Sequence, residues 1–154
     1  MTTEILTVAR RAWLRLARVP GLDAVAARSL LELLGGPEAL LAINASGLAR
    51  AGLAPAGVRA FTTLDETVLE RDLGWLETPG HWLITADDPR YPPQLAATAG
   101  APPAIFVAGE PAVLSSPQLA IVGSRAATAA GRETAFEFAA RLSAAGLAIT
   151  SGLA

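Results

Sequence analysis

The sequence has no cysteine and no lysine among its 154 residues, and it has a single histidine, His81. The absence of cysteine excludes disulfide bonds and thiolate metal sites, and it is typical of a cytoplasmic protein. One histidine cannot form a cluster of histidine ligands, and we expect His81 to be a partly exposed residue after the Pro79-Gly80 turn. We therefore expect neither a metal ion nor another cofactor.

Long apolar runs and a strong charge imbalance are also missing. No apolar segment approaches the roughly 18 to 20 residues that a membrane-spanning helix needs, so we expect no membrane contact. We expect no secretory signal, because residues 1–4 are not a basic segment followed by an apolar one. The formal net charge is −2. Because bulk charge of this sign does not attract nucleic acid, any binding of DNA or RNA must come from a local site.

A strand, a polar turn and the start of a helix follow one another in the last quarter of the chain. The four apolar residues 119–122 are too few for a helix and predict a strand buried on both faces of a parallel sheet. Gly123 allows a sharp turn and the close approach of a ligand. Thr128 is a good N-cap for a helix that turns Phe138 toward the core.

Gly146 ends this helix, and a second short apolar run, 147–150, follows it. The unit is therefore strand, helix, strand, for which a right-handed parallel crossover is expected. Glu137 and Arg141 are four residues apart in the order that favours an ion pair on the outer face of the helix.

The turn has the chemistry of an anion site. Free backbone N–H groups at a helix N-terminus attract anions, Ser124 adds a hydroxyl group, and Arg125 adds forked guanidinium donors. Ser151 and Gly152 follow the next strand and reach the same edge of the sheet. The spacing is not that of a dinucleotide fingerprint, and the lack of lysine excludes a P-loop. The pattern indicates a bound phosphate or other anion; a tight turn with a solvated Arg125 is the alternative.

Residues 4–77 predict a small bundle of helices. Helices are expected over 4–18, over 23–34 with Asp23 as the N-cap, and over 37–43. A short helix capped by Ser46 and a longer one from Pro55 follow.

Four arginines lie in the first helix of this bundle, Arg10, Arg11, Arg15 and Arg18. They predict a solvated face or a contact with nucleic acid.

Two turns in the bundle, 19–24 and 51–56, are similar to helix-hairpin-helix modules. In the first, Asp23 stands where a second glycine would let amides face a phosphate. We therefore interpret these turns as packing or partner contacts rather than as a grip on DNA.

Short strands and turns replace helices after residue 78. Strands are expected at 82–85 and 104–108, with a proline-rich segment between them. Asp87 and Asp88 are adjacent in this segment, and we interpret them as turn formers rather than as an acid–base pair.

Several of these segments together resemble the DNA-processing protein A family, also called DprA or Smf. The resemblance is carried by Ile121-Val-Gly-Ser-Arg125, Thr128, Gly131 and Ser151-Gly-Leu-Ala154, and upstream by Leu83-Ile-Thr85, Asp88-Pro-Arg-Tyr-Pro92 and Phe106-Val-Ala-Gly109. It implies an α + α/β fold, with an all-helical bundle like a sterile alpha motif (SAM) domain over 1–77 and a linker over 78–81. Residues 82–154 would then be the first part of a Rossmann-like parallel sheet, and we expect the chain to be the N-terminal portion of a longer protein.

The resemblance also implies a function. Members of the family bind single-stranded DNA during natural transformation and recombination and load the recombinase RecA onto it, without catalysis. We expect the same of this chain, together with self-association through exposed sheet faces. The DNA-binding residues carried over are Gly123, Ser124, Arg125, Thr128, Gly131, Ser151 and Gly152.

Two other functions stay open on the sequence alone. One is a Rossmann-like enzyme that acts on a nucleotide, although only Glu133 and Glu137 supply carboxylates after residue 119. The other is a protein-interaction module in which the helical bundle docks a partner.

Overall fold

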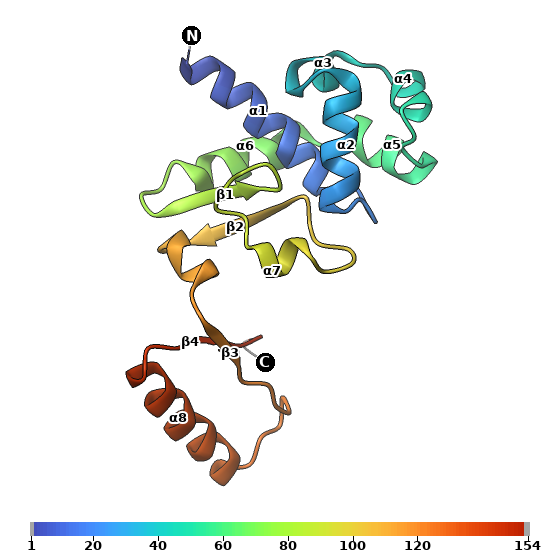
Figure 1. The fold of residues 1–154 in the computed structure, drawn as a ribbon. Helices are drawn as coiled ribbons and strands as arrows, with labels where there is room; N and C mark the ends of the chain where they lie inside the picture. The colour runs from blue at the N-terminus through green and yellow to red at the C-terminus, as the bar shows by residue number, and fades with distance from the viewer. Residues whose placement is uncertain (1, 153–154) are drawn as a thin grey trace. The chain divides into compact units, whose positions relative to one another are not determined.

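The computed structural model describes residues 2–152, with side chains from Thr7 onward. The chain forms two compact units, which divide between Pro111 and Ala112. The first holds most of the helices and an antiparallel pair of strands, and the second holds a parallel pair and one helix (Figure 1). No helix among residues 2–152 is both long enough and apolar enough to cross a membrane.

Six helices build the bundle of the first unit, and they follow the order expected from the sequence. Their bounds are α1 Thr2–Ala17, α2 Ala24–Leu34, α3 Pro37–Ala42, α4 Ala45–Arg50, α5 Pro55–Thr62 and α6 Glu66–Leu76. The cap of α2 is as predicted, because Asp23 Oδ1 accepts a hydrogen bond of 2.8 Å from the amide of Ala26. At its end Gly35 adopts φ +85°, a left-handed conformation that stops the helix.

Two local predictions in the bundle were wrong. Asn44, not Ser46, caps α4, because the helix begins at Ala45 and the Asn44 side chain accepts from the amide of Gly47 at 2.9 Å. The long helix expected from Pro55 is broken into α5 and α6. The Thr63 hydroxyl donates to a carbonyl at the end of α5, and Asp65 accepts from the amide of Thr67 to begin α6.

The core of the first unit lies among these helices and extends to the strands. The largest fully buried side chains are Leu14, Leu16, Leu40, Leu48, Leu69 and Ile84. Ala86 and Ala101, which flank the strand pair, belong to the same buried cluster as α1 and α2. In addition, the amide of Ala24 donates to the carbonyl of Ala101 at 2.7 Å. The domain boundary expected at 78–81 stays a prediction, while the compact first unit extends past it.

The strands of the first unit, β1 (His81–Thr85) and β2 (Ala104–Ala108), pair antiparallel with His81 opposite Ala108. This corrects the expectation that all strands after residue 82 would lie in one parallel sheet. The segment that connects the two strands contains a short helix, α7 (Pro93–Ala96). It brings the chain back to the end of β1, so that Thr85 pairs with Ala104. The amide of Ala86 therefore donates to the carbonyl of Pro103 at 2.9 Å and lengthens the ladder.

The second unit has the strand–helix–strand order predicted from the sequence. After a 3₁₀ helix, η1 (Pro111–Ser115), come β3 (Gln118–Ala120), α8 (Ala129–Ala144) and β4 (Ala148–Thr150), and β3 pairs parallel with β4. Within residues 112–152, one helix and one neighbouring strand are all that can cover β3. All three residues of β3 are exposed, so the prediction of a strand buried on both faces was wrong.

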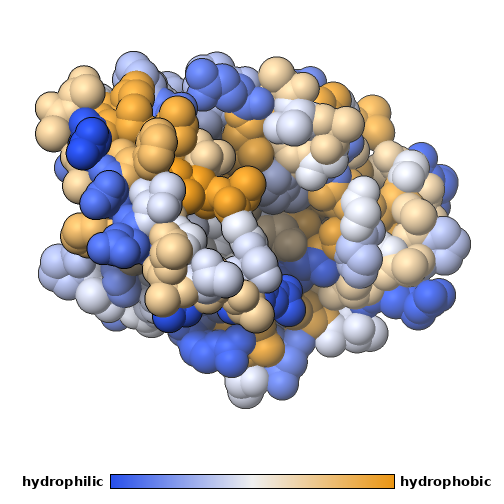
Figure 2. All heavy atoms as spheres, turned by 90° about the horizontal axis from the view of Figure 1, so that it is seen from below, coloured by the Kyte–Doolittle hydropathy of each residue, from blue (hydrophilic) through white to orange (hydrophobic). Residues whose placement is uncertain are grey.

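Apolar side chains of the second unit are open to solvent as well. Phe138, expected to face the core, is 61% exposed, and Phe136 and Val122 are more exposed still. The space-filling view shows hydrophobic side chains at the surface, interspersed with polar ones (Figure 2). These residues form no core of the kind found in the first unit.

Candidate functional site

A hollow of about 570 Å³ lies at the carboxyl ends of β3 and β4, within the second unit. Its walls contain six of the seven residues expected to bind DNA, together with five others. The lining residues are Ile121, Val122, Gly123, Ser124, Ala127, Thr128, Gly131, Arg132, Ala135, Ser151 and Gly152. This is the edge at which open α/β sheets bind ligands.

Strand pairing explains why two distant loops share one hollow. The ladder continues one residue past β3, because the amide of Ile121 donates to the carbonyl of Thr150 at 2.9 Å. Beyond that bond the chain leaves the sheet on both sides, through 122–128 and through 151–152. The parallel register therefore brings Ser151 and Gly152 to the turn that follows β3, as the sequence predicted.

Hydroxyl groups hold the shape of the turn. Ser124 Oγ accepts from the amide of Ala126 at 3.1 Å, and Thr128 Oγ1 accepts from the amide of Gly131 at 3.1 Å. The second bond makes Thr128 the N-cap of α8, which confirms the prediction. A Cβ at Gly131 would lie 3.2 Å from this hydroxyl oxygen, so a side chain there would crowd the cap.

The glycines at the rim of the hollow are not required by the backbone. Gly123 and Gly152 avoid the left-handed region, and a Cβ at either would meet no protein atom within 4 Å. The sharp turn expected at Gly123 therefore does not use a conformation that favours glycine. Because glycine has no side chain, the wall of the hollow is open at these two positions. A ligand can therefore approach the backbone closely there.

The arginine in the wall of the hollow is Arg132, which the sequence reasoning missed. Arg125 lies at the exposed turn beside it and is not part of the lining. The Arg132 side chain donates to the carbonyl of Ala127 at 2.9 Å and so fixes the loop. The sequence could have indicated Arg132, because it lies near the start of the helix that Thr128 caps. None of the hydrogen bonds and ion pairs among residues 2–152 engages the Arg125 guanidinium.

Backbone groups at the start of α8 add to the positive character of the hollow. The amides of Ala129 and Ala130 have no intrahelical acceptor, as in the first turn of any helix. Residues 112–154 carry three arginines and two glutamates, a formal charge of +1, whereas residues 1–111 carry −3. The second unit thus favours an anion although the whole chain is acidic.

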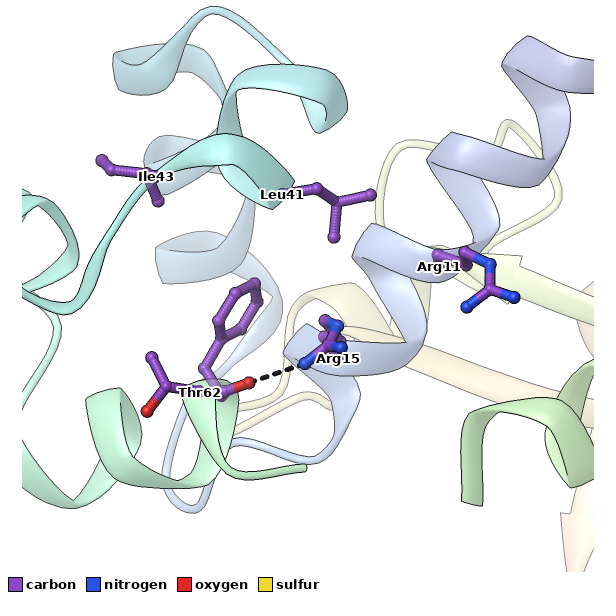
Figure 3. Close-up of a pocket in the computed structure, with 6 residues that line it drawn as sticks. Arg11, Arg15, Leu41, Ile43 and Thr62 are labelled. Atoms are coloured by element: carbon purple, nitrogen blue, oxygen red, sulfur yellow. Dashed lines mark hydrogen bonds between the residues drawn. The ribbon is translucent and has the colours of Figure 1, made fainter. Parts of the chain in front are cut away.

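The arginines of α1 are not available in the same way. Arg11 pairs with Glu66 at 3.1 Å and also with Glu70, and Arg15 pairs with Glu66. Arg15 also donates to the carbonyl of Phe61 at 2.9 Å, beside a hollow that Leu41, Ile43, Arg11 and Thr62 line as well (Figure 3). These side chains join α1 to α5 and α6 through ion pairs at the protein surface, where the side chains of Glu66 and Glu70 are 57% and 60% exposed. The predicted face is therefore solvated, with Arg11 and Arg15 already paired and Arg10 exposed.

The turn at 19–24 also uses its amides inside the protein. The amide of Ala24 donates to Ala101 and that of Ala26 to Asp23, so neither remains for a phosphate. The structure thus agrees with the interpretation of this turn as a packing contact.

His81 and the carboxylates of the second unit fit structural roles. The His81 ring stacks on Trp75 at 3.8 Å, and its Nδ1 lies 2.8 Å from the Trp75 carbonyl oxygen. No group of three or more metal-ligating side chains occurs among residues 2–152. Glu133 and Glu137 do not line the hollow, and the ion pair expected between Glu137 and Arg141 is not formed.

Comparison with known proteins gives matches over most of the chain. The family described as DNA recombination-mediator protein A matches residues 82–154, and the SMF/DprA SAM domain matches residues 9–73. The chain is also similar to Protein Smf of Escherichia coli (strain K12), with 45% identity over 112 residues. That alignment covers 73% of this chain and 30% of the relative, so the chain spans about 30% of the length of the curated relative it matches.

Proposed function

This chain belongs to the DprA/Smf family of DNA recombination-mediator proteins, and from that premise we propose that it binds single-stranded DNA at the hollow of the second unit. The observation that carries the proposal is the convergence of Gly123, Ser124, Thr128, Gly131, Ser151 and Gly152 on one hollow at the N-terminus of α8. Backbone amides, hydroxyl groups and nearby guanidinium groups are the donors that bind DNA phosphates.

Each part of the site has a distinct task in this proposal. The amides of Ala129 and Ala130 receive one phosphate, and Gly123 lets the DNA backbone come close. Arg132 keeps the loop in place through Ala127 while it adds charge to the wall. Arg125 pairs with the same or the neighbouring phosphate, because its guanidinium is exposed and engaged by no described residue.

In this proposal the hollow makes no contact that distinguishes one base from another. Its lining has no aromatic side chain, and Ala129-Ala130 opens the helix with two small residues. Recognition would therefore rest on the backbone of the strand and show little sequence preference.

We also propose the wider activity of the family for this chain: it delivers single-stranded DNA to RecA during natural transformation and recombination, in the cytoplasm and without catalysis. The carboxylates of α8 lie off the hollow, so the proposal assigns no bond cleavage to it. Direct binding of purified RecA, measured by sedimentation with and without the DNA, tests this part.

Self-association is the third part of the proposal. Val122, Phe136 and Phe138 expose 87%, 76% and 61% of their surface, and a second copy could cover them. Analytical ultracentrifugation tests this part: a monomer at every concentration up to the millimolar range would contradict it.

The DNA-binding site is tested by fluorescence anisotropy with a labelled single-stranded oligonucleotide, over a range of salt concentrations. We expect Arg125→Ala to weaken binding and to lower the slope of log K against log salt by about one. The matched control is Arg141→Ala, which removes an exposed arginine from the other end of α8.

The control variant should bind nearly as well as the wild type. An unchanged affinity and slope in Arg125→Ala would show that the loop is scaffold. Tight binding of a free mononucleotide, without binding of the oligonucleotide, would favour the alternative of a nucleotide-dependent enzyme.

A further inference from the structure

A second recess, of about 320 Å³, lies in the first unit between α6, the end of α1 and β2. It is lined by Arg18, Arg71, Asp72, Trp75 and Phe106. None of these residues belongs to the hollow of the second unit. They combine aromatic rings with guanidinium groups.

The aromatic part of the recess is held in place but is not buried. Phe106 is 40% exposed on β2, although it lies opposite the half-buried Leu83 in the ladder. Its ring meets the ring of Trp75 edge-on, with centroids 5.6 Å apart and an interplanar angle of 76°. Trp75 is itself fixed by the stacked ring of His81. The fold therefore orients Phe106 in advance and leaves part of its ring open to solvent.

The charged part of the recess carries an excess of one positive charge. Arg18 pairs with the buried Asp72 through a single guanidinium nitrogen, Nη2. Arg71 is exposed, and no hydrogen bond or ion pair among residues 2–152 engages it. Two guanidinium groups thus face one carboxylate, in a unit whose overall charge is negative. Local charge of this kind selects an anionic ligand.

We propose that this recess is a second contact for single-stranded nucleic acid, in which one base stacks on Phe106 and Arg71 binds an adjoining phosphate. A ligand that is both planar and anionic satisfies the ring and the free guanidinium together, and a nucleotide of a flexible strand has both properties. A duplex hides its bases in the stack and cannot use the ring. The inference rests on the proposed function, since it assigns a further contact for the same class of ligand.

This contact would supply what the hollow of the second unit lacks. The hollow binds phosphate without an aromatic side chain, whereas the recess offers a stacking platform with one free guanidinium. Because every base has a stacking face, the recess would add affinity without adding sequence preference.

The test is a nuclear magnetic resonance titration of the 154-residue chain with an oligothymidylate of about six nucleotides. Both sites are observed in one experiment, because the amide signals of 71–75 and 105–107 report the recess and those of 123–131 report the hollow. We expect shifts in both groups of signals. A short glutamate-rich peptide of the same charge is the comparison ligand, and we expect it to leave the recess signals unchanged.

Two variants measure what the recess contributes to affinity. Phe106→Leu keeps an apolar side chain and removes the ring, and we expect it to weaken oligothymidylate binding about fivefold or more, the loss that corresponds to one stacked base. Arg71→Gln should weaken binding and lower the salt slope by about one. Arg59→Gln removes an exposed arginine from α5, outside the recess, and should have little effect.

The outcomes separate this inference from the proposed function. Shifts confined to 123–131, with full affinity in Phe106→Leu and Arg71→Gln, would overturn the second contact and leave the first. Shifts in neither region would overturn both. Shifts of the recess signals with the peptide but not with the oligothymidylate would also overturn the inference, because the ligand would then be an acidic protein segment.

Discussion

The two units of this protein differ in how their arginines are paired, because ion pairs engage four of the nine arginines in the first unit and none of the three in the second. In the first unit, Arg11, Arg15 and Arg18 are tied to carboxylates of α6, and Arg90 is tied to Asp88. In the second unit, none of the five charged side chains of residues 112–152 forms an ion pair. Burial of apolar side chains differs as well, because every buried hydrophobic residue among those described lies in the first unit, whereas Val122, Phe136 and Phe138 of the second unit are open to solvent.

The first unit is organised around a buried core, and the proposed DNA-binding hollow lies in the unit that has no such core. An arginine that is already paired, as Arg15 is with a carboxylate and a carbonyl, must give up those bonds before it can bind a phosphate. An exposed arginine beside a capped helix start can do so at little cost. Four arginines lie between residues 10 and 18, but three of them, Arg11, Arg15 and Arg18, are paired with carboxylates. The proposed site is instead in the second unit, where no described residue pairs with Arg125.

The largest expected difference concerns burial. Leu16 is fully buried in the first unit, and Leu16→Ala should lower the free energy of unfolding by about 2–5 kcal/mol. Phe138→Ala in the second unit should change it by less than about 0.5 kcal/mol, because the ring is already exposed. Urea denaturation followed by tryptophan fluorescence reports the first unit, which holds all three tryptophans, and circular dichroism reports both.

The second unit also contains a glycine that the fold needs and one that it does not. Gly146 adopts φ +90° after α8, so Gly146→Ala should destabilise this unit by about 1–2 kcal/mol. Gly123→Ala should leave stability within about 0.5 kcal/mol, because its Cβ meets no protein atom.

Circular dichroism during thermal unfolding measures both glycine variants. Gly123→Ala should nevertheless weaken binding of single-stranded DNA, since the methyl group occupies the hollow. Full DNA affinity in this variant would mean that no ligand approaches the backbone at this position.

The smallest expected effect is on pH dependence in the first unit. The Arg90 guanidinium donates to both oxygens of Asp88, at 3.0 and 2.7 Å, and this lowers the pKa of that carboxyl from its ordinary value. A lowered pKa in the folded state adds stability above the ordinary pKa, about 4, and the addition is lost as the pH falls through the folded value.

The comparison variant is Asp88→Asn. Wild type should be the more stable of the two near neutral pH, and the gap should close on acidification below about pH 4. A gap that stays constant down to pH 2 would contradict the assigned ion pair.

The sequence was sufficient for several features that depend on neighbours in the chain, although Ser46 was wrongly predicted as the cap of α4. Asp23 and Thr128 were predicted as helix caps, and the strand–helix–strand order of the second unit follows from apolar runs and Gly146. A cap depends on one side chain and an amide two or three residues away, so sequence alone can indicate it, but it did not separate Asn44 from the nearby Ser46.

Features that depend on distant contacts were missed. The antiparallel pairing of β1 with β2 depends on how the proline-rich segment returns, which no local pattern reports. Likewise, the carboxylates that occupy Arg11 and Arg15 lie more than fifty residues further along the chain. Arg132 was overlooked because its role depends on the hollow around it rather than on a motif.

We infer that Arg15 stabilises the first unit, whereas Arg125 of the second unit binds DNA. These two roles are tested most directly by measuring the free energy of unfolding and the DNA affinity together in Arg15→Ala and Arg125→Ala. Arg15→Ala should cost about 1–3 kcal/mol of unfolding free energy, through the lost hydrogen bond to Phe61 and the lost ion pair, while the folded protein keeps its affinity for single-stranded DNA. Arg125→Ala should keep its stability and lose affinity. The reverse pattern, or an equal loss of affinity in both variants, would contradict the assignment of DNA binding to the second unit.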